Sequence, residues 1–163
     1  MFQHANASVG PSVVMSEHLR LDKELSPAAA ALIAFADPGL DSRITLIGSH
    51  VLDLLCALLR RGTISVSALR LLDWPQSGAA DVVVAPYVAS LAYLGRAVAQ
   101  ARRLLVPLGT LAMHLPEDPN GVLARQAGHL LLLHGFGLVR RQVIDGGTLV
   151  RAELPLHGRL ACA

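Results

Sequence analysis

The chain has 163 residues, which is enough for one domain with a buried core. Hydrophobic residues make up 53% of the chain and charged residues 16%, so the composition excludes a disordered protein. The formal net charge is +2 and the arginines are scattered, so we do not expect the concentrated basic face that nucleic-acid binding needs.

Thiol content and targeting signals predict a cytoplasmic protein. The two cysteines, Cys56 and Cys162, do not have the spacing of metal ligands, so we expect reduced thiols and no metal. The first residues lack the basic segment and apolar core of a signal peptide. The uncharged apolar stretch at residues 82–95 is shorter than the roughly 20 residues that span a bilayer, so we expect no membrane partner.

The residue pattern in the first half of the chain predicts an N-terminal arm, followed by alternating helices and strands. Ser26 is a suitable helix N-cap and Pro27 a suitable first helical residue, so a helix is predicted to begin here. Alternation of Ile64, Val66 and Ala68 with polar residues indicates a strand. The predicted elements are an arm over residues 1–25, a helix from 27 to the stop at Pro38, a strand over 44–47, a helix over 50–61 and a strand over 63–69.

The second half continues the alternation and ends in a hairpin. The β-branched run Val82–Val84 is typical of a strand that is covered on both faces. Glycines 146 and 147 form the predicted turn of the hairpin. The predicted elements are a strand over 82–84, a helix over 89–105, a strand over 110–115, a loop over 116–121, a helix over 120–134 and two strands around the turn.

Strands that alternate with helices predict an α/β fold, a three-layer Rossmann-like arrangement in which helices cover both faces of a mostly parallel sheet. The closing hairpin should add one antiparallel strand. We expect this domain to cover residues 26–157 and to be followed by a short tail over 158–163.

The arrangement over residues 26–155 resembles the class I S-adenosylmethionine-dependent methyltransferases. The resemblance depends most on an acidic residue that opens the fourth strand of that family and on an R-x-L-x-P-G-G run before its fifth strand. The corresponding residues here are Asp81, Arg103, Leu105, Pro107 and Gly109, with Leu108 in place of the first glycine of the pair. The segment HGFGLVRR and the hairpin after it also resemble the end of that family's fold.

The first departure from the family is the loop after the first strand. There the family carries a GxGxG-type motif, whose glycines let the backbone approach the cofactor. This chain has IGSHVLD, in which Gly48 can stand for one glycine while Ser49 and His50 add bulk. We expect Ser49 to cap the next helix, although the resemblance places both Gly48 and Ser49 at the cofactor.

The second departure is at the end of the second strand, where the family places a carboxylate that binds both ribose hydroxyls. Ser67 and Ala68 lie there instead, and a serine offers one hydrogen bond without charge assistance. Asp73 is the nearest carboxylate, and we favour its interpretation as a turn residue over a role at the crevice. Trp74 could stack on an adenine or a partner, or cover the sheet edge.

The third departure is length. About thirty residues that the family pattern places between Gly48 and Asp81 are missing, about the size of one strand–helix unit. We therefore expect the third strand, which lies at the sheet edge in this family, to be absent. The exposed edge would need cover from the N-terminal arm or a second subunit, and on this ground we predict a homodimer.

A tripeptide and a histidine near the expected crevice are further candidates for contact with a substrate. Ala85, Pro86 and Tyr87 resemble the (D/N)PPY element of amino-methylating relatives, but Ala85 replaces the residue that accepts from the target amine. His114 ends a strand at the ligand-facing side and could act as a base, although we expect it to be solvated.

Three functions remain open. The favoured one is a pseudoenzyme with a degenerate cofactor site that acts through protein contacts, since fold can persist when a site is lost. The others are a working, compact methyltransferase for small molecules, and a protein that binds another nucleotide or small ligand. If S-adenosylmethionine binds at all, we expect weak binding, and the residues that the resemblance assigns to it are Gly48, Ser49, Ser67, Asp73, Trp74, Ala85 and Pro86.

Overall fold

The computed structural model describes residues 25–71, 73, 77–116, 118 and 120–156. The predicted C-terminal tail and all but the last residue of the predicted arm lie outside these residues, as does Trp74. The described elements are α1 (Pro27–Ala36), β1 (Arg43–Ile47), α2 (Val51–Arg60), β2 (Ser65–Leu69), β3 (Ala80–Ala85), α3 (Leu91–Leu104), β4 (Leu105–Pro116), α4 (Val122–Leu133), β5 (Gly137–Ile144) and β6 (Gly147–Glu153).

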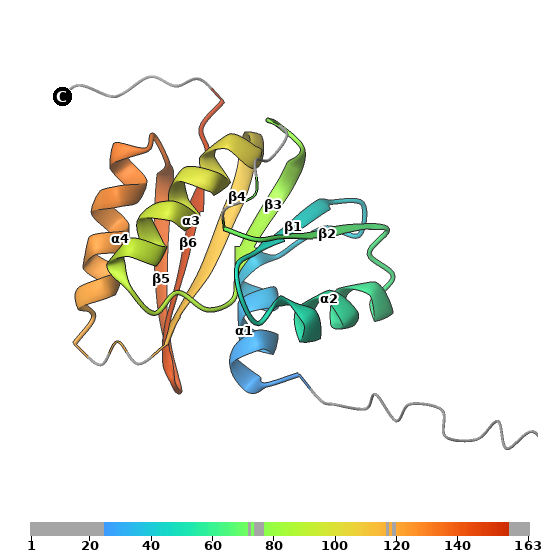
Figure 1. The fold of residues 1–163 in the computed structure, drawn as a ribbon, viewed down its shortest axis with the longest axis horizontal. Helices are drawn as coiled ribbons and strands as arrows, with labels where there is room; N and C mark the ends of the chain where they lie inside the picture. Colours follow the sequence, from blue (N-terminus) through green and yellow to red (C-terminus); the bar gives the residue numbers. More distant parts are fainter. Residues whose placement is uncertain (1–24, 72, 74–76, 117, 119, 157–163) are drawn as a thin grey trace, which may run out of the picture.

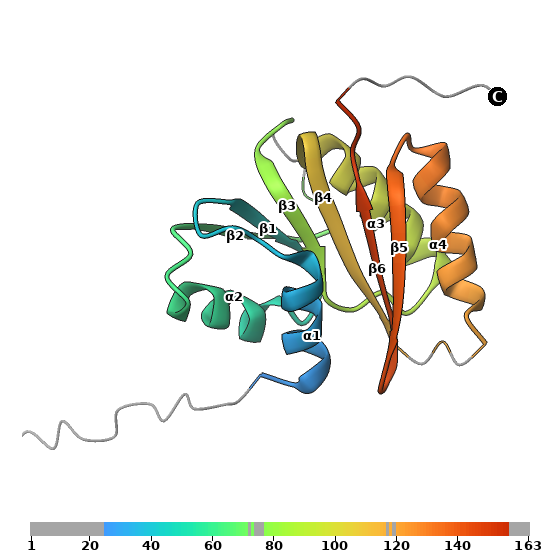
Figure 2. The same ribbon diagram turned by 180° about the vertical axis from the view of Figure 1, so that it is seen from behind.

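Within the described residues, the strands form one six-stranded sheet in the order β2-β1-β3-β4-β6-β5. The first four strands in this order are parallel, and β6 is inserted antiparallel between β4 and β5. Helices α3 and α4 cover one face, and α1 and α2 cover the other, where α2 packs on β1 and β2 (Figures 1 and 2). The predicted α/β class and the antiparallel hairpin strand are confirmed. So is the loss of the third edge strand among the described residues, because β2 forms the edge of their sheet.

The two faces of the sheet carry two separate apolar cores. Successive strand residues point to opposite faces, so a strand buried on both faces is apolar throughout. Val83 belongs to the core under α3 and α4, whereas Val82 and Val84 belong to the core under α1 and α2. The prediction that this strand is covered on both sides is confirmed.

Two of the helices begin at a serine that caps the N-terminus. The hydroxyl of Ser26 accepts a hydrogen bond from the backbone N–H of Ala29 at 3.2 Å, and Pro27 opens α1, as predicted. Ser90 caps α3 in the same way, since its hydroxyl accepts from the N–H of Tyr93 at 3.2 Å. None of the helices in the described part of the chain is long and apolar enough to cross a membrane.

The second strand is shorter than predicted. It begins at Ser65, and Ile64 lies before it with 84% of its surface exposed, so the predicted start at residue 63 is wrong. Ser65 and Ser67 are exposed. In the family, a further strand–helix unit would continue the sheet past this edge. Here β2 is the edge strand, and these polar residues occupy exposed positions on it.

The fourth strand is longer than predicted. It starts at Leu105, directly after α3, and its pairing with β3 shifts register between Ala80 and Val82. Leu108 lies in this irregular stretch with a φ of +66°, a left-handed conformation that favours glycine. This is the position at which the resembled family has a glycine.

Candidate functional site

In open α/β sheets, ligands bind beyond the carboxyl ends of the parallel strands. Here Gly48 follows β1, Arg70 follows β2 and Pro86 follows β3, all at the same end of the sheet. The N–H of Gly48 donates to the carbonyl of Leu69 at 3.0 Å, so the first two strands stay paired up to this end. The candidate site is the region beyond these three strand ends, which we call the crevice.

The side chain of Tyr93 fills the space above Gly48. Tyr93 lies in the first turn of α3, and a Cβ atom added to Gly48 would overlap its hydroxyl and lie 2.8 Å from its ring carbon Cζ. The Tyr93 hydroxyl also accepts a hydrogen bond from the backbone N–H of Ser49 at 3.1 Å. The room that a glycine leaves for a ligand is therefore taken by this protein's own tyrosine.

The start of α2 differs from the prediction. Its N-cap is His50, in the left-handed region with a φ of +59°, and the His50 side chain makes no capping hydrogen bond. The expectation that Ser49 caps α2 is therefore wrong, because Ser49 precedes the N-cap residue by one position. The His50 ring lies against the Tyr87 ring, with the centroids 4.9 Å apart and the planes tilted by 49°.

Asp73 acts as a turn residue, as favoured above. Its Oδ2 atom accepts from the backbone N–H of Arg70 at 2.8 Å, and its own N–H donates to the Arg70 carbonyl at 3.0 Å. Gln100 of α3 holds the same turn from below, because its Nε2 donates to the carbonyls of Arg70 at 2.9 Å and Asp73 at 3.3 Å. The carboxylate is therefore engaged with backbone rather than free at the crevice.

Ser67 was predicted to lie at the end of β2. It lies two residues before that end. Its hydroxyl is 3.0 Å from that of Thr45, its register partner on β1. The hydroxyl of Ser67, which the resemblance places at the position of the family's acidic residue, is thus hydrogen-bonded to Thr45 within the sheet.

The residues at the ends of β3 and β4 are buried. Ala85 and Pro86 are both covered, and the Pro86 carbonyl lies 3.2 Å from Nδ1 of His114. His114 is only 8% exposed, so the expectation of a solvated histidine is wrong, because β6 pairs along β4 and covers it. Its Nε2 atom is buried and has no hydrogen-bond partner among the described residues.

Asp81, the acidic residue that corresponds to the start of the family's fourth strand, has a structural role here. Asp81 receives hydrogen bonds from Arg43: from the backbone N–H at 2.9 Å, from Nε at 3.0 Å and from Nη2 at 2.8 Å. These bonds hold the pKa of the Asp81 carboxyl below its ordinary value. Both residues lie at the amino ends of their strands, away from the crevice.

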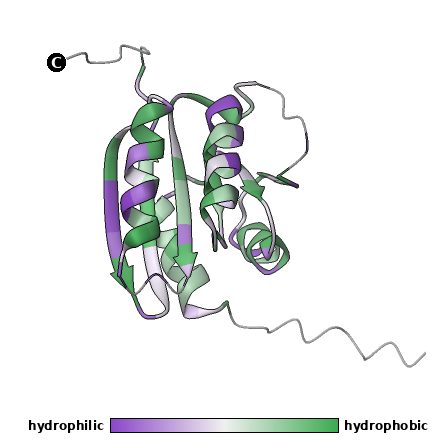
Figure 3. Cartoon of the chain, turned by 60° about the vertical axis from the view of Figure 1, so that its left-hand side comes forward, coloured by the Kyte–Doolittle hydropathy of each residue, from purple (hydrophilic) through white to green (hydrophobic). Residues whose placement is uncertain are grey.

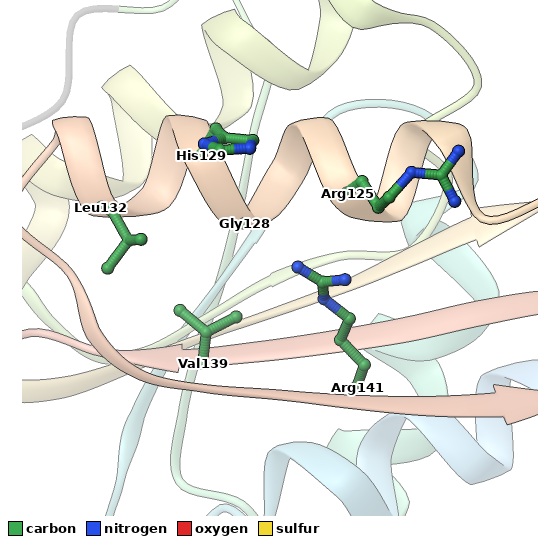
Figure 4. A pocket seen from close by; sticks show the side chains of 6 residues that line it. All are labelled: Arg125, Gly128, His129, Leu132, Val139 and Arg141. Atoms are coloured by element: carbon green, nitrogen blue, oxygen red, sulfur yellow. The ribbon is translucent and has the colours of Figure 1, made fainter.

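A separate hollow of about 390 Å³ lies between α4 and β5 (Figure 4). Arg141 extends from β5 toward Gly128 of α4, whose missing side chain makes room for the guanidinium. Because β5 and β1 lie in different halves of the sheet, this basic groove does not belong to the crevice. Among the described residues, no group of three or more suitable side chains could hold a metal ion.

Sequence reasoning missed two residues that hold the loops around the crevice, Tyr93 and Gln100. Both belong to α3, and each reaches a loop that follows a different strand. No local motif identifies them, because only the packing of α3 on the sheet brings them to those loops.

Comparison with known proteins agrees with this architecture. Neither a protein-family model nor a curated protein sequence gives a match to the chain. Among solved structures, a ribosomal protein L11 methylase from Lactobacillus delbrueckii has a TM-score of 0.61 at 14% identity, over 78% of this chain and 77% of that one. A 1,6-didemethyltoxoflavin-N1-methyltransferase from Burkholderia thailandensis, solved with bound S-adenosylhomocysteine, has a TM-score of 0.56 at 15% identity, over 79% and 77%.

An O-methyltransferase family protein from Burkholderia thailandensis has a TM-score of 0.56 at 14% identity, and 78% of this chain matches 56% of that one. The chain thus spans little more than half the length of that relative. At such low identities the likeness concerns the fold and not the activity. Together with the strand order and the inserted antiparallel β6, these matches show that the chain has the class I S-adenosylmethionine-dependent methyltransferase fold.

Proposed function

We propose that this protein is a methyltransferase-fold pseudoenzyme, in which Tyr93 closes the cofactor position and the activity has been replaced by protein contacts. The observation that carries the proposal is the Tyr93 side chain above Gly48, with its hydroxyl bound to the N–H of Ser49. A cofactor that entered along β1 would have to displace the ring and break that hydrogen bond, at a cost of about 0.5–1.5 kcal/mol for the bond alone.

The ribose position supports the same proposal. Asp73 is engaged with the Arg70 backbone, and Ser67 with Thr45. Losing one charge-assisted hydrogen bond to the ribose costs about 1.5–3 kcal/mol, which is about one to two decades of affinity. The residues present therefore do not fit S-adenosylmethionine.

One observation favours the alternative of a working, compact methyltransferase. His114 lies near the carboxyl end of β4 with a buried Nε2 atom that lacks a partner among the described residues. A nitrogen in that state could accept a proton from a methyl acceptor. Burial of the ring beneath the β5–β6 hairpin argues against access, so we rank this function second.

Titration calorimetry with S-adenosylmethionine and S-adenosylhomocysteine tests the proposal. We expect millimolar or weaker affinity for the unmodified protein and a measurable gain for Tyr93→Ala, which opens the space above Gly48. Tyr87→Ala is the matched control, because Tyr87 is also an aromatic residue at the crevice but contacts His50 instead. Micromolar binding by the unmodified protein would refute the closed site. Equal affinities of the unmodified protein and Tyr93→Ala would show that Tyr93 is not what closes it.

We also propose a cytoplasmic location. Cys56 is a free, half-buried thiol, a state that a reducing compartment preserves.

A further inference from the structure

The two edges of the sheet differ in how they are protected from pairing. The β5 edge carries the adjacent cations Arg140 and Arg141, and its middle is hydrophilic (Figure 3). The β2 edge has the sequence SVSAL, without charge, proline or glycine. Charged residues on an edge strand oppose pairing with another strand, so β5 has this protection and β2 does not.

The backbone of β2 offers hydrogen-bonding groups at this edge. The Leu69 carbonyl accepts from the N–H of Gly48, so it points toward β1. Backbone groups alternate in direction along a parallel strand, so Val66 and Ala68 direct their N–H and C=O groups away from β1. No strand of the described residues pairs with them there.

We propose that this edge binds a second copy of the chain, with the two β2 strands antiparallel about a two-fold axis. In the register that pairs both outward residues within β2, Val66 of one copy exchanges hydrogen bonds with Ala68 of the partner subunit. Ser67 then lies on the axis, opposite Ser67 of the partner subunit. The two six-stranded sheets become one continuous sheet of twelve strands.

A second copy suits this edge better than an unrelated strand, because the edge is complementary to itself. The residue on the axis must face its own copy, and like charges directly opposite each other would destabilise the pair. Ser67 is uncharged and exposed, and a two-fold interface is the commonest arrangement in homo-oligomers.

Helix α2 supports the same geometry. It contacts β2 and β1, whereas α1 packs on β4 and β6, so α2 is the helix next to this edge. A two-fold axis through the β2 pair brings the α2 helices together in antiparallel orientation. The acidic first turn of one, with Asp53, then lies toward the basic last turn of the other, with Arg60 of the partner subunit. Opposite charges at the two ends favour this pairing over a parallel one.

The proposal goes beyond the closed cofactor site, and its test does not depend on cofactor binding. Light scattering of the full chain at micromolar concentration should give the mass of a dimer. Ala68→Lys, which places a charge on the β2 edge, should give a monomer. Val143→Lys on the β5 edge is the matched control and should leave the dimer intact, since Val143 is equally a residue of an edge strand and 83% exposed.

Cysteine cross-linking tests the register. In a background of Cys56→Ala and Cys162→Ala, oxidation of Ser67→Cys should give a covalent dimer, because facing residues of such a pair have Cα atoms about 4.5 Å apart. Ser65→Cys should not cross-link, since the two Cα atoms would lie about 13 Å apart at about 3.3 Å per residue.

The proposal fails if the full chain is monomeric at micromolar concentration, or if a dimer forms without selective cross-linking through position 67. A chain that dimerises only after residues 1–24 are removed would also overturn it, because that result would assign the edge to the N-terminal segment.

Discussion

Substitution of Gly48 by alanine tests the central contact of the crevice. Gly48 has a φ of +98°, and an added Cβ would overlap the Tyr93 hydroxyl. A side chain in this backbone region costs about 1–2 kcal/mol. Forcing extra volume into a packed site costs about 1–3 kcal/mol more. We therefore expect Gly48→Ala to lower the free energy of unfolding by about 2–5 kcal/mol.

Gly62 provides a matched control. Its φ of +84° is similar, but a Cβ built there meets nothing within 4 Å. Gly62→Ala should thus lose only the backbone contribution of about 1–2 kcal/mol. Thermal or urea unfolding measures both variants, and each kcal/mol corresponds to about 2–4 °C in Tm for a domain of this size.

A double variant separates the two contributions. In a Tyr93→Ala background, Gly48→Ala no longer meets the ring, and its cost should fall to that of Gly62→Ala. The reasoning is refuted if Gly48→Ala is no more costly than Gly62→Ala in the unmodified protein. It is also refuted if removing the Tyr93 ring leaves the difference between the two variants unchanged.

Three further substitutions test other contacts. Leu108→Gly should stabilise the protein by about 0.5–1 kcal/mol in urea unfolding, because Leu108 is exposed in a left-handed conformation that glycine adopts without strain; a loss of stability would contradict this. Asp81→Asn should reduce stability at pH 7 but have progressively less effect as the pH falls below about 4. The pKa of Asp81 is depressed by its bonds to Arg43, so its contribution is present above the unfolded pKa and is lost as the pH falls through the folded pKa. A difference between Asp81→Asn and the unmodified protein that stays constant across acid unfolding curves would speak against this. Gln100→Leu should increase the rate of hydrogen exchange and proteolysis in the loop after β2, since Gln100 donates to the Arg70 carbonyl; unchanged exchange there would show that the bond does not hold the loop.

The sequence by itself determined the elements and their order. Signals that act within one element were sufficient for this, such as the Ser26 cap with Pro27 after it and the β-branched run Val82–Val84. Chain length was equally informative. A strand–helix unit needs a minimum number of residues, so the short distance from Gly48 to Asp81 predicted a sheet that ends at β2.

Only the tertiary structure decided which distant side chains meet. The Tyr93 ring above Gly48, the bond from Arg43 to Asp81 and the burial of His114 all join residues from different elements. Periodicity and capping describe a segment on its own and carry no information about which distant side chain will reach a given loop. That is decided when helices pack on the sheet, because close packing leaves each side chain few places to lie.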